Sequence, residues 1–140
     1  MITRLSEEES RKVLQAGRVA RLGCIVDGEP YTVPINYNFE DDCAYSHSLP
    51  GLKIVALRKA PRACLQVDNI ESDFRWKSVL AFGNFEEIKS QDARREVLGK
   101  FLKRFPMLTP VESQIADDAA PPPVIVFRIC IDRITGVEES

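Results

Sequence analysis

Tyr31-Thr32-Val33-Pro34-Ile35-Asn36-Tyr37-Asn38-Phe39 carries the clearest pattern in the chain. Large apolar residues alternate with small or polar ones, and this period of two predicts a strand with one buried face. Pro34 removes one hydrogen-bond donor from the ladder, so we expect the strand at a sheet edge or locally irregular. Backbone groups beside Pro34 are then free to contact a ligand.

Short strands and turns surround this stretch. Strands are predicted at residues 18–26, 43–48, 62–67, 76–88 and 124–131, with turns at 27–28 and 40–42. Gly83 lies inside a predicted strand and indicates a bulge or a close backbone approach. Six short strands at this spacing favour a closed or partly closed antiparallel barrel over a layered parallel sheet. We therefore expect a mainly β fold with peripheral helices.

Three helices are predicted, at residues 7–16, 50–59 and 91–104. Ser6 with Glu9 forms a capping box before the first helix, and Gly17 follows its end. Pro50 suits the start of the second helix, and Ser90 can cap the third. Residues 106–123 hold five of the nine prolines and are expected to form a loop.

Composition narrows the class of protein. The chain has 140 residues, which fits a single domain over 1–140, and its net charge of −2 makes nucleic acid an unexpected partner. It has no apolar run suited to a membrane span or signal peptide, so we expect a cytoplasmic protein. The four cysteines form no Cys-x-x-Cys pair and are expected to be buried free thiols. With one histidine, a metal site is not expected.

The segment Ser46-His47-Ser48-Leu49-Pro50-Gly51-Leu52-Lys53 carries the candidate chemistry. It passes from a strand into the N-terminus of a helix, where unpaired N–H groups and the dipole favour phosphate. Hydroxyl, imidazole and ammonium donors are concentrated there, and Gly51 allows close approach to the backbone. The alternative, equally supported by the spacing, is that Ser48 caps the helix and Lys53 lies solvated on its surface.

Five blocks together resemble the pyridoxamine 5′-phosphate oxidase-like superfamily, and most closely its nitroimidazole reductase branch. The blocks are GRVARL (17–22), DGEPYTVPINY (27–37), SHSLPGLK (46–53), APR (60–62) and WKSVLAFG (76–83). The resemblance implies a six-stranded antiparallel split β-barrel that binds FMN. It also implies a homodimer with FMN at the subunit interface.

The resemblance assigns cofactor-binding residues in two groups. It assigns the FMN phosphate to residues of the donor-rich segment, namely Ser46, His47, Ser48, Gly51 and Lys53. It assigns the flavin ring to a second group, namely Arg18, Val19, Ala20, Pro34, Ile35, Asn36, Tyr37, Trp76 and Ser78. For Trp76 a core or interface anchor is as well supported as a flavin contact, and for Tyr37 core packing is favoured. Arg21 suits a salt bridge as well as a ligand.

Because a flavin carries its own redox chemistry, the lack of an evident triad or carboxylate pair does not exclude an oxidoreductase. We expect a flavin-dependent reductase or oxidase of a small molecule, with NADH or NADPH as an electron donor to be considered. No catalytic residue is assigned, and for His47 phosphate binding is favoured over acid–base chemistry. The alternatives are a non-enzymatic FMN carrier, store or redox sensor, and a haem-handling protein. Haem ligation would want further histidines. The acidic end of the chain, residues 138–140, disfavours vitamin B6 oxidation.

Overall fold

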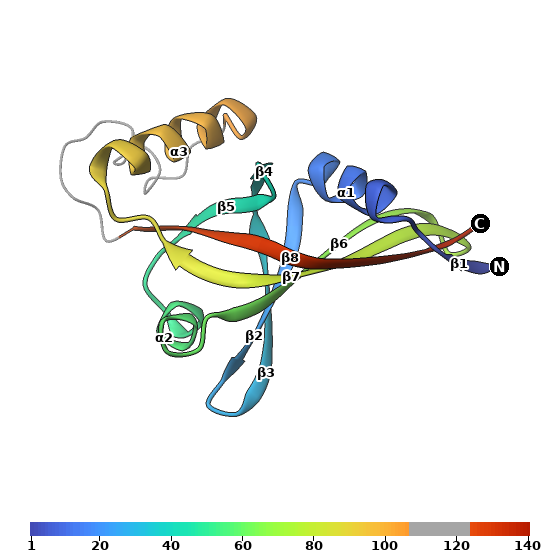
Figure 1. The fold of residues 1–140 in the computed structure, drawn as a ribbon, viewed down its shortest axis with the longest axis horizontal. Helices are drawn as coiled ribbons and strands as arrows, with labels where there is room; N and C mark the ends of the chain where they lie inside the picture. The colour runs from blue at the N-terminus through green and yellow to red at the C-terminus, as the bar shows by residue number, and fades with distance from the viewer. Residues whose placement is uncertain (107–123) are drawn as a thin grey trace.

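An antiparallel sheet and three helices make up residues 1–106 and 124–140, the parts of the chain that the computed structural model describes (Figure 1). The strands are β1 (Ile2–Arg4), β2 (Val19–Val26), β3 (Glu29–Asn36), β4 (Asn38–Glu40), β5 (Cys43–Ser48), β6 (Arg62–Ser72), β7 (Arg75–Glu87) and β8 (Ile125–Glu139). The helices are α1 (Glu7–Ala16), α2 (Leu52–Lys59) and α3 (Gln91–Arg104). The fold is mainly β with peripheral helices, as predicted. Most of the predicted loop 106–123 lies outside the described residues.

The sheet closes through the stretch that β3 and β4 share. Its strand order is β3-β2-β6-β7-β8-β5-β4, with β1 beside β8. β3 pairs with β2 at one edge and β4 pairs with β5 at the other, and only Tyr37 separates β3 from β4. One continuous piece of chain therefore joins the two edges and curls the sheet into a split barrel. Pro34 lies in β3, so the edge position predicted for it is confirmed.

Tyr37 breaks the strand that was predicted to run unbroken over residues 31–39. Its side chain is 0% exposed, and its hydroxyl donates to the carbonyl of Leu14 in α1. A Cβ at Gly17 would collide with this hydroxyl, so the close approach requires glycine there. The buried ring fixes the point at which the chain stops pairing with β2 and starts pairing with β5. A second correction is β1, a short strand that the sequence pattern did not predict.

Local signals place the turns and most helix ends correctly. Ser6 Oγ accepts from the Glu9 backbone N–H at 3.1 Å and donates to the Glu9 carboxylate at 3.0 Å. Asp27 and Gly28 both have positive φ, as a tight turn between β2 and β3 requires. α2 begins at Leu52 without a side-chain cap, so Pro50 precedes the helix rather than opening it.

Gly83 has both features predicted for it. The β7–β8 register shifts between Phe82 and Gly83, which marks a bulge. A Cβ at Gly83 would also collide with the carbonyl of Cys130 on β8. The bulge lies beside the barrel core, so it adds curvature where the long strands bend.

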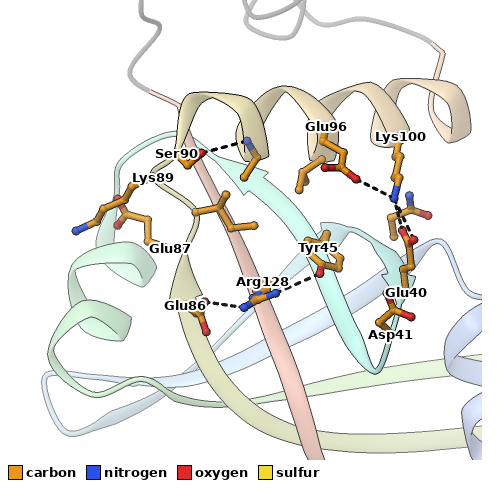
Figure 2. A pocket seen from close by; sticks show the side chains of 14 residues that line it. Glu40, Asp41, Tyr45, Glu86, Glu87, Lys89, Ser90, Glu96, Lys100 and Arg128 are labelled. Carbon is orange, nitrogen blue, oxygen red and sulfur yellow. Dashed lines mark hydrogen bonds and ion pairs between the residues drawn. The ribbon is translucent and has the colours of Figure 1, made fainter.

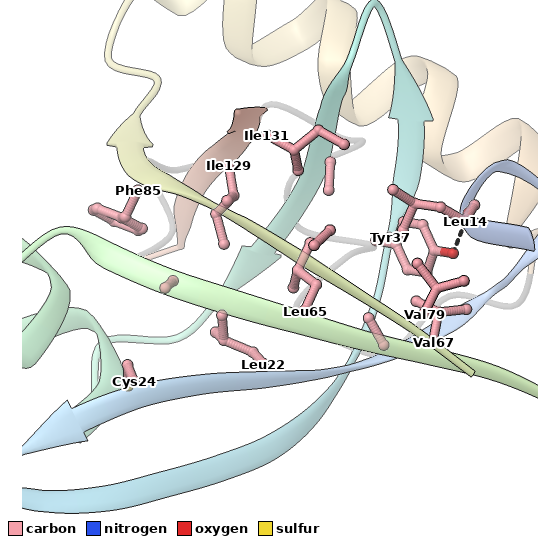
Figure 3. Close-up of a cluster of buried hydrophobic side chains, with 14 of the residues drawn as sticks. Leu14, Leu22, Cys24, Tyr37, Leu65, Val67, Val79, Phe85, Ile129 and Ile131 are labelled. Atoms are coloured by element: carbon pink, nitrogen blue, oxygen red, sulfur yellow. Dashed lines mark hydrogen bonds between the residues drawn. The ribbon is translucent and has the colours of Figure 1, made fainter. Parts of the chain in front are cut away.

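The core fills the inside of the barrel, where alternate residues of β2, β6, β7 and β8 meet (Figure 3). Leu22, Leu65, Val67, Val79 and Ile129 are each at most 1% exposed. β6 and β8 are longer than predicted, and with β7 they continue past the barrel as an arm that carries both termini (Figure 1). β1 pairs with the end of β8 in this arm.

The prediction that all four cysteines are buried free thiols is wrong. Cys43 on β5 lies directly opposite Cys130 on β8, and a disulfide joins them. Cys24 and Cys64 are free thiols. The disulfide could not be predicted from cysteine spacing, because the two bonded cysteines are 87 residues apart and meet only through strand pairing.

Candidate functional site

The outer face of the sheet, turned away from the core, presents a band of exposed apolar residues. Alternation sends Val19 of β2, Leu80 of β7 and Val137 of β8 to this face, where they are 41%, 39% and 37% exposed. Trp76 and Ser78 lie on the same face of β7, two residues apart in the strand. Three predicted ring-binding residues, Val19, Trp76 and Ser78, are therefore on one surface.

A polar cluster lies within this apolar band. Gln66 Nε2 donates to Asp68 Oδ2 at 3.0 Å and to Ser78 Oγ at 3.0 Å. Arg21 Nη1 lies 3.6 Å from Asp68 Oδ2, so Arg21 has the salt-bridge role that was one of its two predicted alternatives. Strand register brings these side chains together, because Arg21 is opposite Gln66 and Asp68 is opposite Ser78.

The other predicted ring-binding residues divide between the two faces of β2 and β3. Pro34 and Asn36 are exposed, and Asn36 Nδ2 donates to the Arg18 carbonyl at 3.3 Å. Ala20 is fully buried and Ile35 packs against the core, so only their backbone groups are available to a ligand. Tyr37 belongs to the core, the role the alternation favoured.

Arg18 points toward α3 rather than toward the apolar band. Its Nη2 donates to the Arg104 carbonyl at 3.0 Å, and its guanidinium lies 4.5 Å from the centre of the Phe105 ring. Arg104 in turn donates to the carbonyls of Tyr37 and Gly17. These contacts hold the end of α3 against the point where the barrel closes.

Only some residues of the segment predicted to bind phosphate lie together at the start of α2. Ser46 is 2% exposed, and its hydroxyl donates to the Asn36 carbonyl at 2.6 Å. The ring of His47 packs edge-on against Phe101 of α3, with 4.7 Å between centroids. Ser48 Oγ donates to the Leu49 carbonyl at 2.8 Å, so it does not cap α2. Ser46 and His47 are thus engaged elsewhere.

Gly51 and Lys53 remain together at the start of α2. A Cβ on Gly51 would meet only the Leu49 carbonyl, at 4.0 Å, so this side of the helix terminus is open. Lys53 is half-buried, and burial lowers the pKa of its ammonium while the nearby Cys24 thiol opposes that shift. Among the described residues, no carboxylate lies within ion-pair distance of Lys53. A half-buried ammonium that no carboxylate of residues 1–106 and 124–140 neutralises suits an anion, as do the N–H groups at the start of the helix.

The apolar band and the start of α2 lie toward opposite ends of β2. Val19 begins the strand, whereas Cys24, beside Lys53, is five residues further along it, or about 17 Å at the usual rise per residue. A ligand that uses both groups must therefore be extended, with its anionic and apolar parts far apart.

A cleft of about 460 Å³ lies under α3, and the sequence did not predict it (Figure 2). Arg128 of β8 forms part of its wall and donates to Glu86 at 2.8 Å and to the Tyr45 hydroxyl at 3.4 Å. Lys100 reaches from α3 to Glu40 at 3.0 Å. Arg128 interrupts the otherwise apolar run of residues 124–131, and this was the one signal in the sequence for a polar cleft. Its charges pair mainly with one another.

A second cleft, of about 440 Å³, lies on the arm beside Trp76. Lys77 and Glu138 also line it. Within residues 1–106 and 124–140, no group of three potential metal-ligating side chains occurs. In the same ranges, none of the helices has the length and apolar character needed to cross a membrane.

Known proteins are similar to this chain in sequence and fold. The sequence profile described as pyridoxamine 5′-phosphate oxidase matches residues 6–138. An uncharacterized protein of Rhizobium meliloti is 34% identical over 94% of this chain and 91% of its own length. The crystal structure of a FAD-binding protein from Mesorhizobium loti is 35% identical, with a TM-score of 0.78 over 100% of this chain and 99% of that chain.

A more distant structure has the same fold. It is a candidate 5-nitroimidazole antibiotic resistance protein from Bacteroides thetaiotaomicron. It is 20% identical, with a TM-score of 0.78 over 99% of this chain and 87% of that chain.

Proposed function

Because the chain belongs to the pyridoxamine 5′-phosphate oxidase family, we propose that it binds FMN and acts as a flavin-dependent oxidoreductase on a small molecule. The observation that carries the proposal is the start of α2, where Gly51 leaves the helix terminus open beside the Lys53 ammonium. These donors fit a phosphate, and the apolar band at the other end of β2 fits a flat ring.

When bound, a flavin supplies hydride and single-electron transfer. The residues of this chain bind and orient it. Lys53 and the first N–H groups of α2 hold the phosphate. Val19, Ser78 and the backbone beside Pro34 flank the ring. Covered by the ring and a second subunit, the apolar band would exclude water from that surface.

We also propose that the protein is a homodimer with the cofactor between the subunits. The outer face carries exposed apolar side chains around a polar cluster, and a surface open to solvent on one side covers little of a ligand by itself. A second copy related by two-fold symmetry would supply the opposite wall and give two equivalent sites.

FAD is the second candidate cofactor, because the 35% identical protein from Mesorhizobium loti is a FAD-binding protein. FAD carries the same ring and a first phosphate, so it would use the same two groups of residues. Whether this protein turns over a substrate or only stores or senses with its flavin is a separate alternative. We favour turnover in the cytoplasm with NADH or NADPH as donor.

The test starts with the absorption spectrum of the purified protein. We expect a yellow protein with one FMN per subunit, identified by chromatography after acid release. Anaerobic NADPH should then bleach the flavin, and an acceptor should restore the colour. A folded, colourless protein that takes up neither added FMN nor FAD would contradict the proposal. A bound flavin that neither nicotinamide donor reduces would favour the storage or sensor role.

A further inference from the structure

We propose that Gln66 is an additional flavin-binding residue, whose side-chain oxygen accepts a hydrogen bond from the N3–H of the isoalloxazine ring. Neither the resemblance nor the predicted site includes Gln66. The inference rests on the proposed flavin function, and it specifies which part of the ring is recognised and by which residue.

The first step is the orientation of the Gln66 amide. Its Nε2 carries two hydrogens, and both have acceptors, Asp68 Oδ2 and Ser78 Oγ, at 3.0 Å each. A carboxylate can only accept, so the nitrogen and not the oxygen of Gln66 must face Asp68. The amide is thereby locked, and Oε1 is left as an acceptor for a group outside the cluster.

The second step is the location of this acceptor. Gln66 is opposite Leu80 on β7 and opposite Arg21 on β2, so it lies in the apolar band and not at its rim. Ser78, its hydrogen-bond partner, is one of the predicted ring-binding residues. If the band is covered by a ring and a second subunit, Oε1 loses water and needs a new donor.

The third step matches the donor to the site. The pyrimidine edge of oxidised flavin has one N–H between two carbonyl oxygens. Gln66 supplies an acceptor for that N–H. Arg21, in register with Gln66, has five N–H donors, of which one points to Asp68 at 3.6 Å. An acceptor with a neighbouring donor is complementary to this edge, whereas a phosphate would find the Asp68 carboxylate repulsive.

The experiment compares wild type with Gln66→Met, which keeps the length of the side chain but has no amide. FMN and riboflavin share the ring, so we expect both affinities to fall by the same factor, about three- to tenfold. Thr135→Val is the matched control, because Thr135 lies on the same face opposite Leu80 but outside the cluster. The control should bind both flavins as wild type does.

A direct readout is the N3–H resonance of bound ¹⁵N-labelled FMN. In wild type we expect a deshielded proton protected from solvent exchange, and in Gln66→Met an upfield shift with faster exchange. Asp68→Asn provides a second variant. It gives position 68 a donor and lets the Gln66 amide turn, so the same resonance should move although Gln66 is still present.

Several outcomes would overturn the inference. An N3–H resonance that is the same in wild type and Gln66→Met means that Gln66 is not its acceptor. A monomeric Gln66→Met protein whose residual bound FMN keeps the wild-type resonance assigns Gln66 to the subunit contact instead. A wild type that binds neither FMN nor riboflavin is a different result, since it removes the proposed function itself.

Discussion

Lys53 is the charge on which the phosphate half of the proposed site depends. We expect Lys53→Ala to weaken FMN binding by about ten- to a hundredfold, the usual effect of removing a charge-assisted hydrogen bond. Riboflavin has no phosphate, so its affinity should hardly change. Lys59→Ala is the matched control, because Lys59 belongs to the last turn of the same helix. Titration by flavin fluorescence measures both ligands, and equal losses for FMN and riboflavin would exclude Lys53 as the phosphate ligand.

The same lysine gives the binding a pH dependence of known sign. Burial lowers the pKa of Lys53, so its charge is lost at a lower pH than that of an exposed lysine. FMN affinity should therefore be highest below this pKa and fall as the pH rises through it. Below the pH at which the flavin N3–H itself ionises, riboflavin binding and Lys53→Ala should both lack this fall.

At the scale of elements, the disulfide ties β5 to β8. Closing a loop between residues 87 apart restricts the unfolded chain by about 4–5 kcal/mol in the loop-entropy treatment. We expect dithiothreitol, or Cys130→Ser, to lower the free energy of unfolding by about 2–5 kcal/mol in urea. Dithiothreitol should have no further effect on Cys130→Ser.

Thiol titration provides the control for that prediction. Unfolded wild type without reductant should show two free thiols, Cys24 and Cys64, and four after reduction. Four thiols before reduction, with a urea midpoint insensitive to dithiothreitol, would contradict it. A disulfide is also uncommon in the cytoplasm, so the same titration in freshly lysed cells tests the proposed location.

Elements with local causes were predictable from the sequence. The capping box at Ser6 and the turn at Asp27-Gly28 depend on neighbouring residues alone, and both are where the pattern places them. The break at Tyr37 was not predictable, because it depends on where a ring enters the core beside Gly17. The Cys43–Cys130 pair depends on register between distant strands, which no local pattern contains.

The candidate site divides in the same way. Gly51 and Lys53 are two residues apart in sequence and remain together at the helix start. His47 was expected beside them, but it packs on Phe101 because α3 covers that side of β5. The Gln66 cluster was missed because its members come from three strands that only the sheet brings into register.

At the scale of the whole molecule, the proposed dimer should depend on the outer face. Leu80→Arg puts a charge into the middle of the apolar band, where burial against a second copy would be costly. We expect it to convert a dimer into a monomer in sedimentation experiments and to reduce FMN retention. Val55→Arg, at a similarly exposed position on α2, is the control and should leave the assembly unchanged. A wild-type monomer that holds FMN tightly would contradict the dimer.

The position of β8 has a consequence for how the chain folds during synthesis. Of the strands in the described residues, β8 is synthesised last, yet it lies inside the sheet and pairs with β1, β5 and β7. Until it emerges, β7 and β5 each present an unpaired edge and the barrel cannot close. Until β8 is made, these strand edges are open to other chains, and closure of the barrel depends on contacts between distant parts of the sequence.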